Sequence, residues 1–323
     1  MSSENYLKCF KFPFFVLKVF DTLLTGDMKE ICEALKELLK VNSFGKMNER
    51  NLMIRENKRM MRIEKLFFGL PIFTCLVTVI KALSFDMKRR ELPFKTWVYW
   101  DYKNNLPSYW FTVIIQCVGA PILSLLNFSI DMIQIAFMHY LNVMLKEFSV
   151  EIESLEPDKM SFNDTKEYDR LCKCVDCFVQ LKDLGSKIST HLSTTFFIQA
   201  ILSALILCTS TFLLTTLSFV NEAPTFIRTT FYCLTMLIQI FLPCYYGNEV
   251  TLTSDKISTT LFHSKWVDGD QKYKKAVTIF MENTKRSIKI SAFGFVFVDI
   301  ETLTTICNTT YSLYALVSKI AQK

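Results

Sequence analysis

The 323-residue sequence is poor in the residues that make loops and flexible linkers, with only 8 Gly and 8 Pro. This scarcity excludes collagen-like repeats and long low-complexity linkers, and no internal repeat of solenoid or propeller period is present. The three histidines, His139, His191 and His263, are far apart in the sequence. GxSxG, HExxH and glycine-rich phosphate-loop motifs are missing. The sequence therefore predicts neither an enzyme nor a cofactor.

The cysteines do not indicate a disulfide framework, although eleven are present. The string CKCVDC at 172–177 offers three thiols with no nearby His or fourth Cys, which is an incomplete zinc set. We therefore expect no metal and reduced thiols. Several other cysteines fall inside apolar segments, where free Cys behaves as a small hydrophobe: Cys75, Cys117, Cys208, Cys233 and Cys307.

The net charge of +6 does not indicate a nucleic-acid partner. The basic residues are spread over several loops that flank apolar segments, and they form no basic face interleaved with aromatics. The N-terminal stretch also lacks a cleavable signal peptide, because Lys8, Lys11 and Lys18 interrupt its apolar run. The charges are better interpreted as a record of membrane topology.

Half of the residues are hydrophobic and 29 are Phe, which favours a polytopic helical membrane protein. A spanning helix needs about 20 mostly apolar residues. Five segments meet this criterion: 67–85, 109–145, 196–218, 226–246 and 292–318. A sixth segment, 9–25, is a doubtful span because Lys11 and Lys18 are costly at mid-membrane.

The segment 109–145 is long enough for two spans, and the distribution of Lys and Arg decides between one helix and two. One helix leaves 25 Lys and Arg on one side of the membrane and 8 on the other, whereas a hairpin near Asn127 gives 13 against 20. We therefore predict one long helix, with Asp131 and His139 toward its water-exposed end. The basic side is cytoplasmic, so the C-terminus is expected outside the cell.

Two further segments, 27–43 and 270–290, have the apolar periodicity of amphipathic helices. They suit an intracellular interface between subunits, or helices lying on the anionic inner leaflet. Pro243, followed by Gly247, is expected to kink or hinge the fourth of the five apolar segments.

The last apolar segment carries hydroxyls along one face, at Thr302, Thr305, Thr309 and Ser312. These hydroxyls could bond back to the preceding turn or join neighbouring helices. Alternatively, several copies of the helix surround a water-filled pore, with Asp299 and Glu301 as an acidic ring at the cytoplasmic mouth. A constriction near Tyr314 and Ser318 could then gate by dewetting.

The C-terminal third resembles a known family in the order and spacing of three strings. These are YYGNEVTLTSDKISTTLFHSKW, KYKKAVTIFMENTKRSIKISAFGFVFVDIETL and TTYSLYALV. Together with RRELPFKTWVYWDYKNNLPSYWFTVIIQ they are similar to insect odorant receptors over residues 27–320. The resemblance implies seven transmembrane helices with a cytoplasmic N-terminus and an extracellular C-terminus, assembly as tetramers through a cytoplasmic anchor, and a last helix that lines a cation pore.

On this resemblance the chain is an odorant-gated nonselective cation channel subunit in the plasma membrane of olfactory neuron dendrites. Its implied partners are a small volatile odorant, the shared coreceptor subunit in a heterotetramer, and membrane lipid. The implied organisation is a partial span at 1–26, a cytoplasmic segment at 27–66, a ligand-binding bundle at 67–246 with a cytoplasmic loop at 147–190, an anchor at 247–290, and the pore helix with the extracellular tail at 291–323.

The family's ligand pocket lies among helices two to six in the outer half of the membrane. Helix one of the family pattern is missing here and helix two is short, so a truncated nonfunctional or modulatory subunit is the second hypothesis. A secondary transporter is the third, although no inverted repeat supports it. The implied ligand-binding residues are Thr78, Lys81, Trp110, Ile114, Cys117, Phe231, Tyr232 and Thr235.

Overall fold

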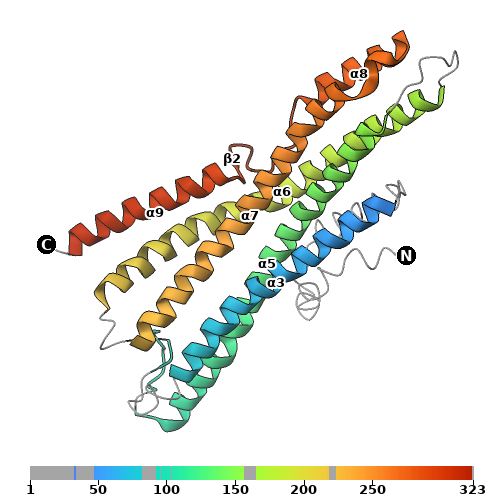
Figure 1. Ribbon diagram of the computed structural model, residues 1–323. Coiled ribbons are helices and arrows are strands. Elements are labelled where there is room, and N and C mark those ends of the chain that lie inside the picture. Colours follow the sequence, from blue (N-terminus) through green and yellow to red (C-terminus); the bar gives the residue numbers. More distant parts are fainter. Residues whose placement is uncertain are drawn as a thin grey trace.

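The computed structural model shows a bundle of long helices with one short hairpin in the part of the chain that it describes (Figure 1). The described residues are 33, 47–81, 92–94, 96–102, 104–155, 165–217 and 223–321. The segment 9–25 and nearly all of 27–43 lie outside them. The elements are α3 (Met47–Lys81), α5 (Leu106–Glu153), α6 (Thr165–Thr216), α7 (Ala223–His263), η5 (Lys265–Asp268), α8 (Gln271–Thr284), β1 (Ser291–Ala292), β2 (Val296–Phe297) and α9 (Ile300–Ala321).

Helix α5 is a single helix of 48 residues, which confirms the prediction of one helix rather than two. At 1.5 Å per residue it is about 72 Å long, more than twice a hydrocarbon core of about 30 Å. Asp131 and His139, expected toward the water-exposed end of this helix, are buried inside the protein. Each side chain is only 2% exposed, because α6 and α7 pack over this part of α5.

The helices α3, α6 and α7 also run beyond their apolar segments. We expected boundaries between the transmembrane bundle and cytoplasmic segments at residues 66, 190 and 246. Instead α3, α6 and α7, respectively, continue through these positions as unbroken helices. Helix α7 does not end at Pro243 but runs on to His263. Among the described residues, four helices are long and apolar enough to cross a membrane: α3, α5, α6 and α7.

The fifth expected span, 292–318, is not helical throughout. Its first residues form the antiparallel pair of β1 and β2, with Ser291 opposite Phe297, and α9 begins only at Ile300. The turn between the strands places Phe293 and Gly294 at φ values of 53° and 77°. This left-handed backbone cannot continue a right-handed helix, so the chain turns here before α9 starts.

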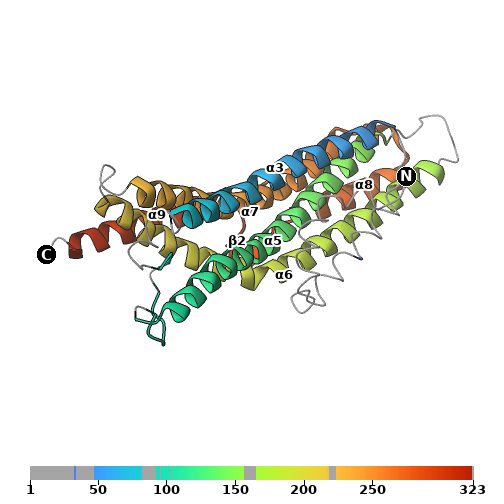
Figure 2. The same ribbon diagram turned by 90° about the horizontal axis from the view of Figure 1, so that it is seen from below.

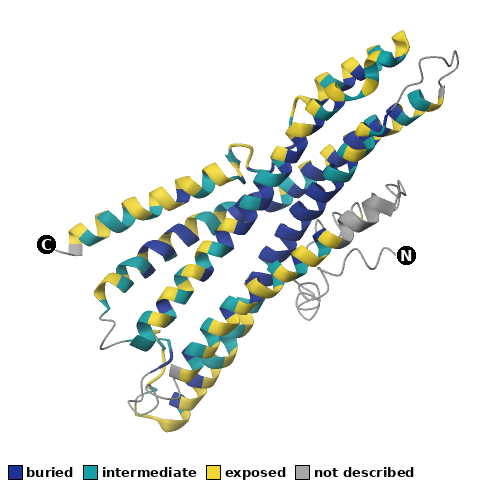
Figure 3. Cartoon of the chain, in the orientation of Figure 1, coloured by how far each residue is buried: buried dark blue, intermediate teal, exposed yellow. Residues whose placement is uncertain are grey.

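The densest packing lies in the middle of the molecule, where residues 131–145 of α5 are all buried (Figure 3). They share one hydrophobic cluster with residues of α6 and α7 such as Leu184 and Val250. Two buried hydroxyls there have side-chain partners on other helices. The Tyr140 hydroxyl donates to Asn57 Oδ1 at 2.8 Å, and the Thr253 hydroxyl donates to Asn142 Oδ1 at 2.6 Å. We call this region, residues 131–145 of α5 and the parts of α6 and α7 around them, the packed half.

Helix α8 confirms the amphipathic periodicity expected at 270–290, although the helix itself ends at Thr284. Its buried residues are spaced four, three and four apart, as one face of a helix requires. The Asp270 carboxylate caps its first turn by accepting from the Tyr273 backbone N–H at 2.7 Å. The buried residues are Tyr273, Val277, Phe280 and Thr284.

Gly247 was expected to weaken α7, but it has a different structural role. A Cβ atom at this position would lie 2.0 Å from the carbonyl oxygen of Val298. The chain entering α9 therefore crosses α7 at a point where only glycine leaves enough space. This crossing fixes the start of α9 against the bundle.

Candidate functional site

A cavity of about 580 Å³ lies among α3, α5, α6 and α7. Most of its wall is apolar, with side chains such as Leu123, Ile198 and Met236. Tyr232 and Thr235, both expected from the sequence to bind ligand, line this cavity. A mainly apolar space of this volume suits a small organic molecule.

The other residues expected to bind ligand do not line this cavity. The buried Thr78 hydroxyl donates back to the Thr74 carbonyl at 2.8 Å, within its own helix. The Phe231 ring packs edge-on against Phe73 of α3, with ring centroids 4.8 Å apart. Lys81 ends α3, and its side chain lies outside the described part of the structure.

Trp110, Ile114 and Cys117 lie in the first turns of α5. Trp110 and Ile114 are 42% and 58% exposed, so they face outward from this chain. Cys117 packs against a small separate cluster that includes Tyr109. The structure thus separates these three residues from Tyr232 and Thr235, which line the cavity.

Sequence reasoning missed a polar cluster that borders the same cavity. Asp131 of α5, Gln199 of α6 and Gln239 of α7 all line it. The Gln239 amide donates from Nε2 to Asp131 Oδ2, and Gln199 lies beside the same carboxylate. The sequence did contain a signal, because a carboxylate and two amides inside apolar segments are functional candidates by default.

Helix α9 diverges from the bundle toward the C-terminus (Figures 1 and 2). Within the described residues of α9, Ile306 is the one buried residue. Tyr311 is 71% exposed and Ile320 is 65% exposed. Much of the apolar surface of this helix therefore has no covering from the described part of its own chain.

The expected hydroxyl stripe faces a groove of about 640 Å³ between α9 and α6. Thr302, Thr305 and Thr309 line this groove opposite Ala200 and Ala204. The Thr305 and Thr309 hydroxyls donate to carbonyls one turn earlier, at 3.0 and 2.8 Å, so each hydroxyl can still accept a hydrogen bond. Further along α9, Ser312 is exposed, and Tyr314 and Ser318 are half-buried.

The two carboxylates expected at a pore mouth have different surroundings. Asp299 precedes α9, and its Oδ1 accepts from the Thr302 backbone N–H at 2.8 Å, so it caps the helix. Glu301 is exposed. Both border the groove, which places negative charge at the first turn of α9.

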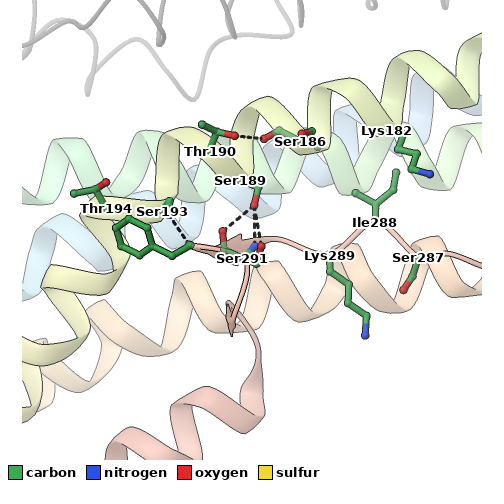
Figure 4. A pocket seen from close by; sticks show the side chains of 13 residues that line it. Lys182, Ser186, Ser189, Thr190, Ser193, Thr194, Ser287, Ile288, Lys289 and Ser291 are labelled. Carbon is green, nitrogen blue, oxygen red and sulfur yellow. Dashed lines mark hydrogen bonds between the residues drawn. The ribbon is translucent and has the colours of Figure 1, made fainter.

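Hydrogen bonds attach the strand before α9 to α6 (Figure 4). Ser189 of α6 donates to the Ser291 carbonyl at 2.8 Å and accepts from the Ser291 N–H at 2.9 Å. Ser193, one turn further on, accepts from the Phe293 N–H at 2.6 Å. From α7, Ser254 accepts from the Ile288 N–H at 2.9 Å. The chain entering α9 is thus held by α6 and α7, two of the four helices that border the cavity. We call Ser189, Ser193 and Ser254 the serine clasp.

The three cysteines at 172–177 lie in different surroundings: Cys174 and Cys177 are buried, and Cys172 is exposed. In the described part of the chain, no three His, Cys, Asp or Glu side chains gather as metal ligands would.

Long apolar helices around a ligand-sized cavity are features of a multi-pass membrane protein. The model of the 7tm odorant receptor family matches residues 9–311. The chain therefore belongs to the insect odorant receptor family, so it is a membrane protein of olfaction and not an enzyme.

Relatives and solved structures agree with this assignment. The chain is 25% identical over 266 residues to odorant receptor 94a of Drosophila melanogaster, covering 82% of this chain and 68% of the relative. It is 25% identical over 273 residues to odorant receptor Or1 of Anopheles gambiae, covering 77% and 64%. The chain thus spans about two thirds of the length of these curated relatives.

The fold is similar to that of the olfactory receptor OR5 from Machilis hrabei. The TM-score is 0.75 at 15% identity, covering 99% of this chain and 83% of the other. The structure of the same receptor in complex with eugenol matches with a TM-score of 0.68 at 15% identity, covering 97% and 88%. These matches confirm an all-helical membrane bundle.

Proposed function

We propose that this chain is the odorant-sensing subunit of a ligand-gated, nonselective cation channel. It works in a heterotetramer with the shared coreceptor subunit, in the plasma membrane of olfactory sensory neuron dendrites. Odorant binds in the cavity among α3, α5, α6 and α7, in contact with Tyr232 and Thr235. The other residues expected from the resemblance contribute only after ligand-induced or subunit-induced rearrangement.

The observation that carries this proposal is the uncovered state of α9. Helix α9 exposes hydroxyls and the Asn308 amide. A membrane helix with such groups on its surface faces protein or water rather than lipid. Copies of α9 from neighbouring subunits cover its apolar residues, and its hydroxyls and Glu301 line the conduit. The large excess of Lys and Arg beside one set of helix ends supports a cytoplasmic anchor and an extracellular C-terminus.

The serine clasp gives a route from the ligand to the pore. The cavity is bordered by α6 and α7, and the clasp ties the chain before α9 to these same two helices. A ligand that favours a different spacing of α6 and α7 therefore favours a different position of α9. The shift in population is limited by the ligand's difference in affinity for the two states.

Current recordings test the channel activity. Cells that express the full chain with the coreceptor are expected to give odorant-evoked cation currents. Cells in which this chain lacks a functional α9, or the coreceptor lacks its last helix, are expected to give no such current. Absence of current across a broad odorant panel, with both subunits at the surface, contradicts the proposal.

Cysteine labelling tests the pore. The exposed Cys307 is first replaced by Ser, and Thr302, Thr305 or Thr309 is then changed to Cys. A small hydrophilic thiol reagent is expected to change the odorant-evoked current at these positions. A cysteine at Leu76 of α3, which is 55% exposed and lies inside the apolar segment 67–85, is the lipid-facing matched control. Equal inertness of all four positions overturns the assignment of α9 to a conduit.

A further inference from the structure

The polar cluster of Asp131, Gln199 and Gln239 lies where the three long helices α5, α6 and α7 meet beside the cavity. Asp131 is 2% exposed and Gln239 is 3% exposed. A cluster this well buried is insulated from bulk water, so its hydrogen-bonding capacity must be met by protein, by trapped water or by a ligand.

The hydrogen bond within the cluster fixes the direction of one amide. Gln239 Nε2 donates to Asp131 Oδ2, since the reverse orientation would bring the amide oxygen against carboxylate oxygens. The Gln239 Oε1 atom is therefore turned away from Asp131. In the described part of the chain this buried oxygen has no hydrogen-bond partner.

Gln199, which lies beside the same carboxylate, adds a second unused acceptor. Its Oε1 and Nε2 atoms are both buried, and neither makes a hydrogen bond of acceptable geometry to a described residue. Both amide oxygens belong to residues that border the cavity. The cavity thus combines apolar walls with a carboxylate, two unpartnered amide oxygens and one unpartnered amide nitrogen, a set that an O–H group can satisfy both as donor and as acceptor.

We propose that this cavity selects small, mainly apolar molecules that carry one hydrogen-bond donor, of which an alcohol is the simplest example. The O–H group donates to Gln239 Oε1 or Gln199 Oε1, and the hydrocarbon part lies against the apolar wall. A molecule that can only accept leaves the two oxygens unpaired, and a hydrocarbon does the same. This inference rests on the proposed function, because it takes the cavity as the odorant site.

The test compares isomers that differ only in the donor. Octan-1-ol and 1-methoxyheptane have the same composition, and further alcohol and ether pairs vary the chain length. Ligand binding to the purified full chain in nanodiscs is measured as the rise in Tm with concentration. The alcohol of a pair is expected to bind about ten-fold more tightly than its ether.

Two variants separate this preference from partition into the lipid. Gln199→Met removes the amide oxygen together with the amide nitrogen while keeping the length of the side chain. Because only the alcohol can pair with both atoms, the variant is expected to reduce the alcohol-to-ether ratio several-fold. Met236→Leu alters the apolar wall of the same cavity and is expected to change the binding of both isomers alike.

Equal binding of both isomers in every pair, or no binding of any, overturns the inference. So does an unchanged alcohol-to-ether ratio in a folded Gln199→Met protein. Binding is measured here without the coreceptor and without current. A chain that lacks channel activity can therefore still satisfy this test, and an active channel can still fail it.

Discussion

The packed half of the molecule differs in burial from the region that contains the first residues of α5 and α7 and the last residues of α6 (Figure 3). In the packed half, residues 131–145 of α5 are buried without interruption. Toward Leu106 the same helix alternates between covered and exposed residues, and large apolar side chains such as Phe111 and Leu123 are more than half exposed. We call this second region, residues 106–123 of α5 with residues 198–216 of α6 and 227–238 of α7, the open half.

The difference shows where stability and adaptability reside. Apolar exposure is costly in water but not against lipid, so the open half can remain loosely packed in a membrane. The packed half has its apolar groups buried, and hydrogen bonds such as that of Thr253 to Asn142 join its helices, which fixes the relative positions of α5, α6 and α7. The cavity lies at the boundary, with Asp131 on the packed side and Leu123 on the open side. A ligand there can move the open half against a rigid base.

The largest contrast is expected between two glycines. Gly247→Ala places a Cβ atom 2.0 Å from the Val298 carbonyl oxygen, a backbone atom that cannot rotate away. The chain before α9 must then separate from α7, and we expect the protein to lose about 3 kcal/mol or more of stability. Thermal unfolding in detergent, followed by size-exclusion fluorescence, measures the loss.

The control for this prediction is Gly119→Ala in the open half. Nothing lies within 4 Å of the Cβ atom at that position, and alanine favours helix over glycine by about 0.5–1 kcal/mol. We expect Gly119→Ala to unfold at the same or a slightly higher temperature. If the two variants lose equal stability, the close crossing of α7 and Val298 does not exist in the folded protein.

The second contrast is between two aliphatic side chains of α5. Leu141 is fully buried in the packed half, so Leu141→Ala leaves a cavity and is expected to cost about 2–5 kcal/mol. Ile114→Ala in the open half removes a side chain that is 58% exposed, and the expected cost is below about 1 kcal/mol. The two stability losses are compared from the unfolding midpoints of both variants in the same nanodiscs. A larger loss for Ile114→Ala would mean that a neighbouring subunit covers this face.

The two halves also differ in how far the sequence could predict them. The single long α5 followed from the distribution of Lys and Arg, and the buried face of α8 followed from apolar spacing. Both depend on local sequence or on charge counts. The cavity residues were harder, because which faces of α5, α6 and α7 meet depends on how each helix is rotated. Of the residues expected to bind ligand, Tyr232 lines the cavity, whereas Trp110 and Ile114 face outward.

The hairpin before α9 was missed for a different reason. The string SAFGFVFV at 291–298 is apolar throughout, so it was assigned to the membrane span. The turn depends on Phe293 in the left-handed region, which few non-glycine residues adopt. It is held there by contacts distant in sequence, including the Ser193 hydroxyl and the Phe197 ring, whose centroid lies 5.5 Å from that of Phe293. Gly294 was the one local signal.

The smallest expected effect concerns the serine clasp, which links the packed half to α9. Ser189→Ala removes both hydrogen bonds to Ser291, and Ser193→Ala removes the acceptor for Phe293 N–H. Each loss is worth about 1 kcal/mol, or about five-fold in an equilibrium constant. If the clasp transmits ligand binding to α9, this factor should change the odorant concentration for half-maximal current, with surface expression unchanged.

Ser186→Ala is the matched control for the clasp. Ser186 lines the same pocket as Ser189 and Ser193, about one turn earlier on α6, but its hydroxyl makes no bond to β1 (Figure 4). We expect its concentration–response curve to coincide with that of the unmodified chain. The double variant Ser189→Ala/Ser193→Ala should shift the curve further than either single variant, in the same direction. If all three single variants give identical curves, α9 is positioned by its crossing of α7 at Gly247 alone, and the route from ligand to pore must run through α7 rather than α6.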